Sequence, residues 1–506
     1  MELPVFGAVL LLVSVAALLG ARVQRDDELP SLVGWGLANR EHGTFRTWCL
    51  LGGTIFTAYT TIAVPALVYG VGGLGFFAVP YTIIVFPLAY VVLPRLWELA
   101  ARHGCLTPAD LVKLRTGSSS LALAVALTGI LATMPYVALQ LLGLQALLEA
   151  LGVPPDGTRG DVALALVTGI LAVAVFRRGL RAASVVSVLK AALIFPATVL
   201  VVCVATARAG ASEVFRTAGT ALPEKGGDLL LRPGLSTAYV SLAVGSALAL
   251  VVYPHVVTAA LSARSPDVLR RSCVLLPAWT ALLGLTALLG LFALSAGIST
   301  PAGAAELAVP QLVLSLLPGA LAALVLGAVG VAALVPAAVM SVAVAATFTR
   351  NVYVEYVHPT ATPKHQQSVA RIVSGLVKVG ALAFVLALRT QDAIDLQLLG
   401  GVWVLQTFPA VVLAAFTTWP HRWALLTGWG VGMTLGTAAV AGRGFIAVLP
   451  VDVGPVEVQV YSALLALLVN LAVVVTGTLV LDRLRVPRGM DRTAGMTPGE
   501  HLWGPA

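Results

Sequence analysis

Hydrophobic positions along the chain form long apolar runs, and the charged positions fall mostly in the short segments between them. Runs of roughly 20 residues recur, and each is long enough as a helix to cross about 30 Å of hydrocarbon. The 49 glycines and 29 prolines fit this reading, because membrane helices use them for close packing and for breaks. The runs predict thirteen transmembrane helices, near residues 3–21, 49–70, 74–94, 120–152, 161–176, 183–207, 236–262, 273–297, 309–347, 372–388, 394–418, 423–441 and 459–481.

Composition supports a polytopic α-helical membrane protein. Of the 506 residues 58% are hydrophobic and only 11% are charged, and the mean hydropathy is +0.95. A soluble protein of this length needs far more charge to cover its surface. No Walker-type phosphate loop and no H-E-x-x-H or G-x-S-x-G motif occurs, which argues against ATP-driven transport and against an intramembrane hydrolase. The four cysteines are scattered without metal-ligand spacing, so no metal site is predicted.

The positive charges predict the orientation. With the N-terminus outside and thirteen spans, the inside loops carry about three times as many lysines and arginines as the outside loops. This asymmetry accounts for the net charge of +8, and no basic soluble face remains for a nucleic-acid partner. The only charged residue before the first run is the acidic Glu2, so the positively charged start of a signal peptide is absent. We therefore interpret the run as a retained helix. We expect a multi-pass protein of the inner (cytoplasmic) membrane with its C-terminus in the cytoplasm.

Three motifs resemble those of one transporter family. They are "AVPALVYGVGGLGF" (63–76), "RLWELAARHGCLTPADLVKLRTGS" (95–118) and "TFTRNVYVEYVHP" (347–359), in which Asn351 stands where the family commonly has Asp. In this order and spacing the chain resembles the sodium:solute symporter family over roughly residues 35–480. Within that family, three further stretches resemble the bacterial monocarboxylate permeases: "GFFAVPYTIIVFPL" (75–88), "ALTGILATMPYVALQLLG" (126–143) and "ALVPAAVMS" (333–341).

The resemblance implies the leucine-transporter-like fold, in which two inverted repeats of five helices enclose the substrate near the midplane. Here the repeats would be spans 2–6 and 7–11, at about residues 49–207 and 236–418. They would lie in one transmembrane domain, 1–482, followed by a short cytoplasmic tail, 483–506. The implied function is a secondary transporter without a cofactor, importing small carboxylates such as pyruvate, lactate, acetate or propionate across the lipid bilayer. A small accessory membrane subunit is a further partner to consider.

Span 2 carries the polar residues expected where the first helix of the first repeat breaks. The stretch "GGTIFTAYTTIAVPALVYG" (52–70) contains three glycines, four threonines and a proline. The unwound, substrate-binding segment is predicted at Thr57, Ala58, Tyr59, Thr60 and Thr61, whose hydroxyl and N–H groups could receive a carboxylate. The alternative is that the threonine hydroxyls only bond back to their own helix.

Spans 4 and 7 offer further candidates. Tyr136 and Gln140 are four residues apart and share a helical face, so they could line the substrate cavity or make a helix–helix hydrogen bond. Tyr253 and His255 lie toward the inner end of span 7. Tyr253 is a candidate substrate residue, and His255 could be a coupling residue because imidazole titrates near neutral pH. A packing or gating role for His255 is the alternative.

The family's sodium-binding hydroxyl pair is missing from this chain. Counting back from "TFTRN", the corresponding positions are about Val335 and Pro336, which are apolar. Sodium is a hard cation that prefers oxygen ligands, and only backbone carbonyls near Gly53, Phe56 and Ala332 would remain. Pro336 could compensate in part by freeing a carbonyl one turn earlier. We therefore expect a degenerate sodium site, with Na+ as coupling ion less favoured than a proton.

Two lysines in the predicted spans could supply a positive charge. Lys190 in span 6 passes beside the expected sodium site, and its ammonium could replace the ion and bridge span 6 to the carbonyls of spans 2 and 9. The alternative is that Lys190 extends its flexible stem to water at the inner end. For Lys378 in span 10 this extension to water is the favoured interpretation.

Two rival functions stay open at this point. The first keeps the fold but makes the protein a sodium-coupled symporter of another small solute, such as an amino acid. The second is a ligand-sensing membrane protein of transporter-like sequence. Such sensors usually append a cytoplasmic signalling domain, for which residues 483–506 leave no room.

Overall fold

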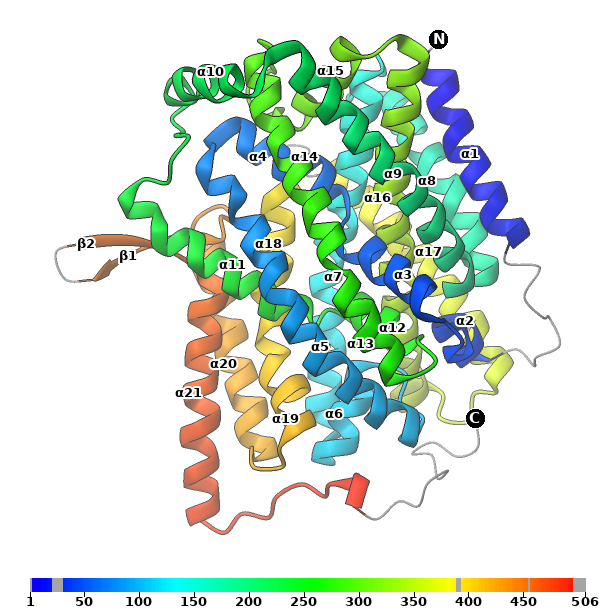
Figure 1. Ribbon diagram of the computed structural model, residues 1–506. Helices are drawn as coiled ribbons and strands as arrows, with labels where there is room; N and C mark the ends of the chain where they lie inside the picture. Colours follow the sequence, from blue (N-terminus) through cyan, green and yellow to red (C-terminus); the bar gives the residue numbers. More distant parts are fainter. Residues whose placement is uncertain (1, 21–30, 388–392, 454–455, 495–506) are drawn as a thin grey trace.

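The computed structural model describes residues 2–20, 31–387, 393–453 and 456–494 and is predominantly helical (Figure 1). Through the first predicted repeat the helices are α1 (Glu2–Gly20), α2 (Leu32–Leu37), η1 (Ala38–Arg40), α3 (Thr44–Ile55), η2 (Tyr59–Ala63), α4 (Val64–Val71), η3 (Gly73–Phe77), α5 (Ala78–His103), α6 (Pro108–Thr116), α7 (Ser119–Ala150), α8 (Thr158–Arg178), α9 (Leu180–Ala209) and α10 (Ala211–Glu224).

The remainder comprises η4 (Pro233–Leu235), α11 (Ser236–Leu250), α12 (Pro254–Leu261), α13 (Pro266–Leu275), α14 (Pro277–Ser295), η5 (Ala305–Leu307), α15 (Ala308–Leu316), α16 (Gly319–Phe348), η6 (Thr349–Val357), α17 (Pro363–Ala387), α18 (Ala393–Val404), η7 (Leu405–Thr407), η8 (Pro409–Leu413), α19 (Ala414–Phe416), α20 (Arg422–Ala441), β1 (Val448–Val453), β2 (Val456–Tyr461), α21 (Ser462–Arg483) and η9 (Arg492–Ala494).

Each predicted span coincides with helical structure over most of its length, but residues 459–461 of the last predicted span belong to the strand β2. Within the described residues, nine helices are long and apolar enough to cross a membrane, and up to twelve spans result if each of three bent pairs is one span. Helix α8 lies at the predicted fifth span but outside that count, so thirteen spans stay a prediction. The predicted span 309–347 is in fact two helices, α15 and α16, because Leu317 and Pro318 are extended. The residue before a proline disfavours the helical conformation, which explains the break.

The first helix of each predicted repeat is broken, as the sequence led us to expect. Helix α3 and the segment Tyr59–Val71 meet at 54°, and α11 and α12 meet at 48°. In the second break Pro254 begins α12 directly after the extended Tyr253, a position that suits a residue without an N–H. In the first, Pro65 cannot donate to the carbonyl one turn earlier, and the preceding residues form the wider π-helix η2.

A third bend was not predicted. Residues 393–407 and 409–416 meet at 42°, within the predicted eleventh span. Pro409 begins the π-helical turn η8 there, because a proline cannot donate the helical hydrogen bond to the preceding turn. The sequence predicted a span here, at 394–418, without assigning a bend to it.

A two-stranded antiparallel hairpin, β1–β2, joins α20 to α21 and pairs Val448 with Tyr461. Tyr461 anchors the hairpin to the bundle: its N–H donates to Ser241 Oγ at 2.9 Å and its hydroxyl donates to the Leu398 carbonyl at 2.7 Å. Gly401 makes room for this tyrosine, since a Cβ there would lie 2.2 Å from the phenol oxygen. The last two helices are therefore fixed to α11 and α18.

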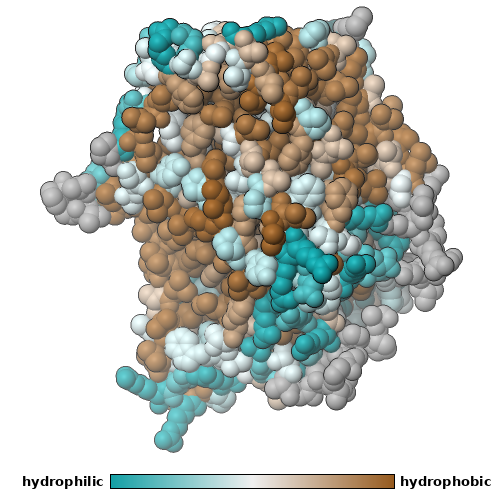
Figure 2. All heavy atoms as spheres, in the orientation of Figure 1, coloured by the Kyte–Doolittle hydropathy of each residue, from teal (hydrophilic) through white to brown (hydrophobic). Residues whose placement is uncertain are grey.

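The molecular surface fits a membrane environment. In Figure 2 hydrophobic residues cover most of the height of the visible face, and hydrophilic ones gather at its top and in its lower part. Large apolar side chains such as Leu12, Ile83, Leu166 and Val379 are more than half exposed. Exposed apolar area on this scale is stable only against lipid or another apolar surface.

Helix α10 and the C-terminal end of α21 lie at opposite ends of the bundle (Figure 1). We predict that Ser212→Cys on α10 reacts with a membrane-impermeant maleimide on intact cells. Arg483→Cys should react only after permeabilisation, because the predicted topology places it at the cytoplasmic end. The exposed Cys203 is replaced by serine in both variants to remove background labelling. Labelling of both positions from the same side would contradict the predicted topology.

Candidate functional site

The break in span 2 is shorter than predicted and begins one residue earlier. Helix α3 ends at Ile55, and Phe56 and Thr57 are the non-helical residues. The prediction that Tyr59, Thr60 and Thr61 are unwound was wrong: they form η2, a π-helix. The released N–H of Tyr59 donates to Thr57 Oγ1 at 3.0 Å.

Lys190 on α9 lies against this break. The side chain is 1% exposed, so its amine does not extend to water as the alternative interpretation supposed. The Nζ atom donates to the carbonyls of Gly53 at 2.9 Å and Ala332 at 3.0 Å, and also to that of Phe56. These are the carbonyls that the sequence left for an ion. The ammonium thus joins α9 to the end of α3 and to α16.

Both helices have a local reason to offer free carbonyls here. The last carbonyls of any helix lack an intrahelical donor, so Gly53 and Phe56 are available because α3 ends at Ile55. In α16, Pro336 has no N–H to donate to the carbonyl four residues earlier, that of Ala332. The negative end of the α3 dipole also favours a cation at this position.

Val335 lies beside the same carbonyls. A Cβ built on Gly53 would be 3.5 Å from Val335 Cγ1 and 3.2 Å from Ser187 Oγ. The Ser187 hydroxyl donates to its own helix, to the Ala183 carbonyl at 2.8 Å. Where the family is expected to place hydroxyl oxygens, this chain therefore presents a methyl group to α3, and Pro336 contributes through the carbonyl that it frees.

Three buried rings, those of Tyr136, Tyr253 and His255, form a cluster, and a fourth buried ring, that of Tyr59, packs against Tyr81. Tyr59, Tyr136, Tyr253 and His255 are each at most 2% exposed. The ring centroids of Tyr136 lie 5.4 Å from those of both Tyr253 and His255, and the latter two are 5.1 Å apart. The hydroxyls of Tyr59 and Tyr253 and both nitrogens of His255 have no hydrogen-bond partner among the described residues. Unpaired buried donors are rare in native structures, so this cluster is a candidate polar ligand site.

Of the other predicted substrate residues, some already have hydrogen-bond partners within the protein and one does not. Gln140 Oε1 accepts the N–H of Ala58 at 3.0 Å, so it makes the helix–helix hydrogen bond that was the alternative to cavity lining. Thr61 Oγ1 bonds back to the Thr57 carbonyl at 3.5 Å. The Thr60 hydroxyl is buried with no partner in the described part of the chain, while its carbonyl accepts Thr286 Oγ1 at 3.0 Å.

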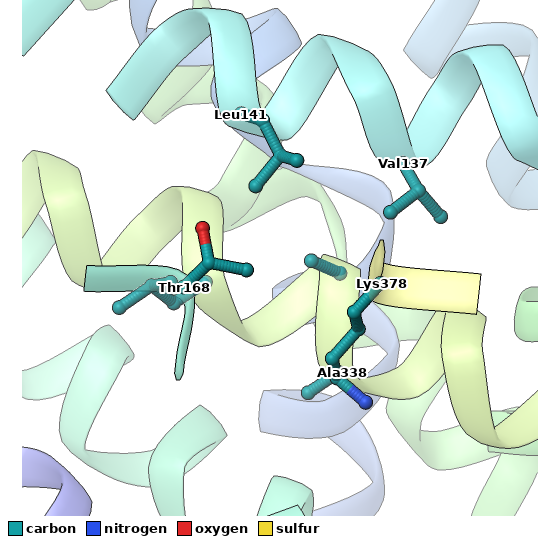
Figure 3. Close-up of a pocket in the computed structure, with 7 residues that line it drawn as sticks. Val137, Leu141, Thr168, Ala338 and Lys378 are labelled. Atoms are coloured by element: carbon teal, nitrogen blue, oxygen red, sulfur yellow. The ribbon is translucent and has the colours of Figure 1, made fainter. Parts of the chain in front are cut away.

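Lys378 does not extend to water, and that prediction was wrong. The side chain is buried on α17, and its Nζ donates to Ser341 Oγ at 2.7 Å, Ser374 Oγ at 3.0 Å and the Ser374 carbonyl at 3.2 Å. Figure 3 shows it beside a small cavity that is otherwise lined by residues of α7, α8 and α16, among them Thr168 and Ala338. Three oxygens inside the bundle replace the water that this ammonium would otherwise need. Lys378 does not contact the break in α3.

The two inner motifs that carried the family resemblance meet in space. Thr107 caps α6 and donates to Asn351 Oδ1 at 2.7 Å, and Asn351 Nδ2 donates to Asp110 Oδ1 at 2.7 Å. Asp110 also accepts the Leu106 N–H at 2.8 Å and faces Arg350 at 3.7 Å. No role was predicted for these side chains, although they lie in two of the stretches that carry the family resemblance, 95–118 and 347–359. They fix the loop after α5 to the inner end of α16.

The two broken spans are joined by backbone hydrogen bonds between the segment before α3 and the segment after α12. The His42 N–H donates to the Ser262 carbonyl at 3.1 Å, and the Arg264 N–H donates to the His42 carbonyl at 3.0 Å. His42 Nδ1 lies 2.9 Å from Ser262 Oγ. Burial, with Arg46 and Arg181 nearby, lowers the pKa of His42 to about 4, so the ring is neutral at physiological pH. This short backbone ladder holds the segment before α3 against the end of α12.

Comparison with known proteins agrees with these features. Residues 35–422 match the model of the sodium:solute symporter family. The chain is 42% identical over 475 residues to a monocarboxylate transport permease protein of Rhizobium johnstonii, covering 94% of this chain and 95% of that protein. It is also 26% identical over 395 residues to the uncharacterized symporter YodF of Bacillus subtilis, covering 76% and 77%.

Among solved structures, a Na+-coupled sialic acid symporter in a substrate-bound, outward-open state aligns with a TM-score of 0.75. The alignment covers 97% of this chain and 98% of that one at 15% identity, so the likeness concerns the fold alone. It confirms the predicted leucine-transporter-like fold of an all-α membrane protein.

We predict that Asp110→Asn destabilises the protein by about 2–4 kcal/mol, because it removes the charge facing Arg350 and one of the acceptors used by Leu106 and Asn351. Thermal unfolding in detergent should show a clear drop in melting temperature. Ser119→Ala removes only a 3.4 Å contact to Glu355 at the edge of the same region and serves as the control. Equal melting temperatures for Asp110→Asn and the control would contradict this assignment.

Proposed function

Because the chain belongs to the sodium:solute symporter family, it is a secondary transporter and not an enzyme, and we propose that it imports short-chain monocarboxylates together with a proton. The substrates would be acids such as pyruvate, lactate, acetate and propionate. The observation that carries the proposal is the Lys190 ammonium, held by three backbone carbonyls where the family is expected to hold its ion.

The geometry of the Lys190 amine supports a tethered cation in place of sodium. A free sodium ion at these carbonyls would face the ammonium at contact distance, and like charges repel strongly in a medium of low polarity. Loss of the proton from Lys190 would weaken the three bonds that join α9 to α3 and α16. Proton binding and release at one amine could thus control how firmly the broken helix is attached to its neighbours.

The candidate substrate site suits a carboxylate. The hydroxyls of Tyr59 and Tyr253, the ring of His255 and the N–H groups at the break are neutral hydrogen-bond donors or can act as donors. Neutral donors can hold a carboxylate without a guanidinium, and the Lys190 ammonium on the Phe56 carbonyl supplies a positive charge at the break. Co-transport of one proton with one monocarboxylate is electroneutral. The similarity to a monocarboxylate permease supports the same substrate class.

We predict that an inward pH gradient without sodium drives uptake of labelled pyruvate, lactate or acetate into proteoliposomes, and that Lys190→Ala abolishes this uptake. Lys378→Ala is the matched control, since it removes a second buried lysine that does not touch α3. It should retain pH-driven uptake. A requirement for a sodium gradient in the unaltered chain would instead favour the sodium-coupled alternative, as in the sialic acid symporter of similar fold.

The proposal also predicts a gain of function. Lys190→Ala removes the tethered cation, and Val335→Ser adds an oxygen beside Gly53, so the double variant should regain a cation site with oxygen ligands. Its uptake should be stimulated several-fold by sodium at equal pH, whereas the single Lys190→Ala variant responds less. No sodium response in a double variant that still binds substrate would argue against an ion site at these carbonyls.

A further inference from the structure

The side chain of Gln140 is held between α7 and the break in span 2. It is fully buried, its Oε1 accepts the Ala58 N–H at 3.0 Å, and its Nε2 donates to the Tyr136 carbonyl at 3.1 Å. One turn further along α7, Gly143 lets the helix approach closely, since a Cβ there would lie 2.8 Å from Ala58 Cβ. The amide oxygen of Gln140 therefore reaches the break across a tight helix–helix contact.

The N–H of Ala58 and the Lys190 ammonium lie at opposite ends of the break in span 2. The carbonyls of Gly53 and Phe56, at the C-terminal end of α3, hold the cation. The N–H of Ala58 stands at the start of the second half-helix, whose positive end favours an anion. A carboxylate oxygen would bind where the amide oxygen of Gln140 now lies.

The aromatic rings near Gln140 carry unpaired polar atoms, which also indicates a ligand site. Tyr136, one turn before Gln140 on α7, contacts Tyr253 and His255, and these two carry unpartnered polar atoms. These groups are nine-tenths or more buried. The Ala58 N–H is paired only because Gln140 supplies the oxygen.

We propose that Gln140 is an internal stand-in for the substrate carboxylate, which occupies the Ala58 N–H while the carrier returns without substrate and yields it when substrate binds. The inference rests on the proposed function, because it requires a carboxylate substrate. A symporter completes its cycle by closing around an unloaded site. Without Gln140 that closure would bury an unpaired N–H, which is costly in hydrocarbon. With substrate bound, the carboxylate satisfies the same N–H and Gln140 is not needed.

The test compares two modes of transport in proteoliposomes. Net uptake under a pH gradient includes the unloaded return, whereas exchange of labelled for unlabelled pyruvate, saturating on both sides, does not. Gln140→Met keeps the size of the side chain but lacks the acceptor. We expect it to slow net uptake about tenfold, the effect of about 1.4 kcal/mol, and to leave exchange within about twofold of the unaltered chain.

Two further variants sharpen the test. Gln140→Glu places a tethered carboxylate on the Ala58 N–H, so both modes should fall and the apparent KM for pyruvate should rise. Gln406→Met is the matched control, because this buried glutamine bonds to the Val402 and Ala463 carbonyls away from the break. It should change the two modes equally. If Gln140→Met does not insert, Gln140→Asn, one methylene shorter, replaces it.

Equal loss of net uptake and exchange in the Gln140→Met protein would overturn the inference and make Gln140 a structural residue or a direct substrate ligand. No loss in either mode would overturn it as well. If the unaltered chain transports none of the acids in either mode, the proposed substrate class fails and the inference falls with it. Transport by the unaltered chain, with both modes equally slow in the variant, overturns the Gln140 inference alone.

Discussion

A helix that breaks inside hydrocarbon leaves backbone groups that cannot bind water, and this constraint shapes the centre of the molecule. The carbonyls freed where α3 ends, and the one freed by Pro336 in α16, converge on a single point. The Lys190 ammonium satisfies three of them at once. Carbonyls left unpaired by Pro336 in α16 and by the end of α3 thus receive their hydrogen bonds from one lysine of α9.

The same break has two chemically different ends. Its carbonyl end holds a cation and its N–H end holds the amide oxygen of Gln140, so opposite charges are favoured on opposite sides of Phe56 and Thr57. On the inner side, the backbone ladder at His42 and the cluster around Asp110 fix the elements that surround the breaks.

The sequence was informative where the determinants are local. Apolar runs located the helices, and the polar residues of span 2 located the start of its break to within one residue but placed its end four residues too far along the chain. Lys378 was misread, because its ammonium is satisfied by Ser374 on its own helix together with Ser341 of α16, and the sequence does not show that α16 packs there. The bend at Pro409 was missed, since a single proline bends some membrane helices and not others. The partner of Asp110 lies 241 residues along the chain, a distance over which no periodicity in the sequence carries information.

The ammonium of Lys190 is attached to α9 by its own side chain, which gives it a property that no dissolved ion has. A tethered group has an effective concentration at its binding point that does not depend on the surrounding solution. Dilution of salt outside the cell cannot empty these carbonyls, and only a proton can leave. The occupancy of the carbonyls by the amine thus depends on the side chain of Lys190 and not on the salt concentration. The surrounding solution can change the charge of the amine but cannot remove it.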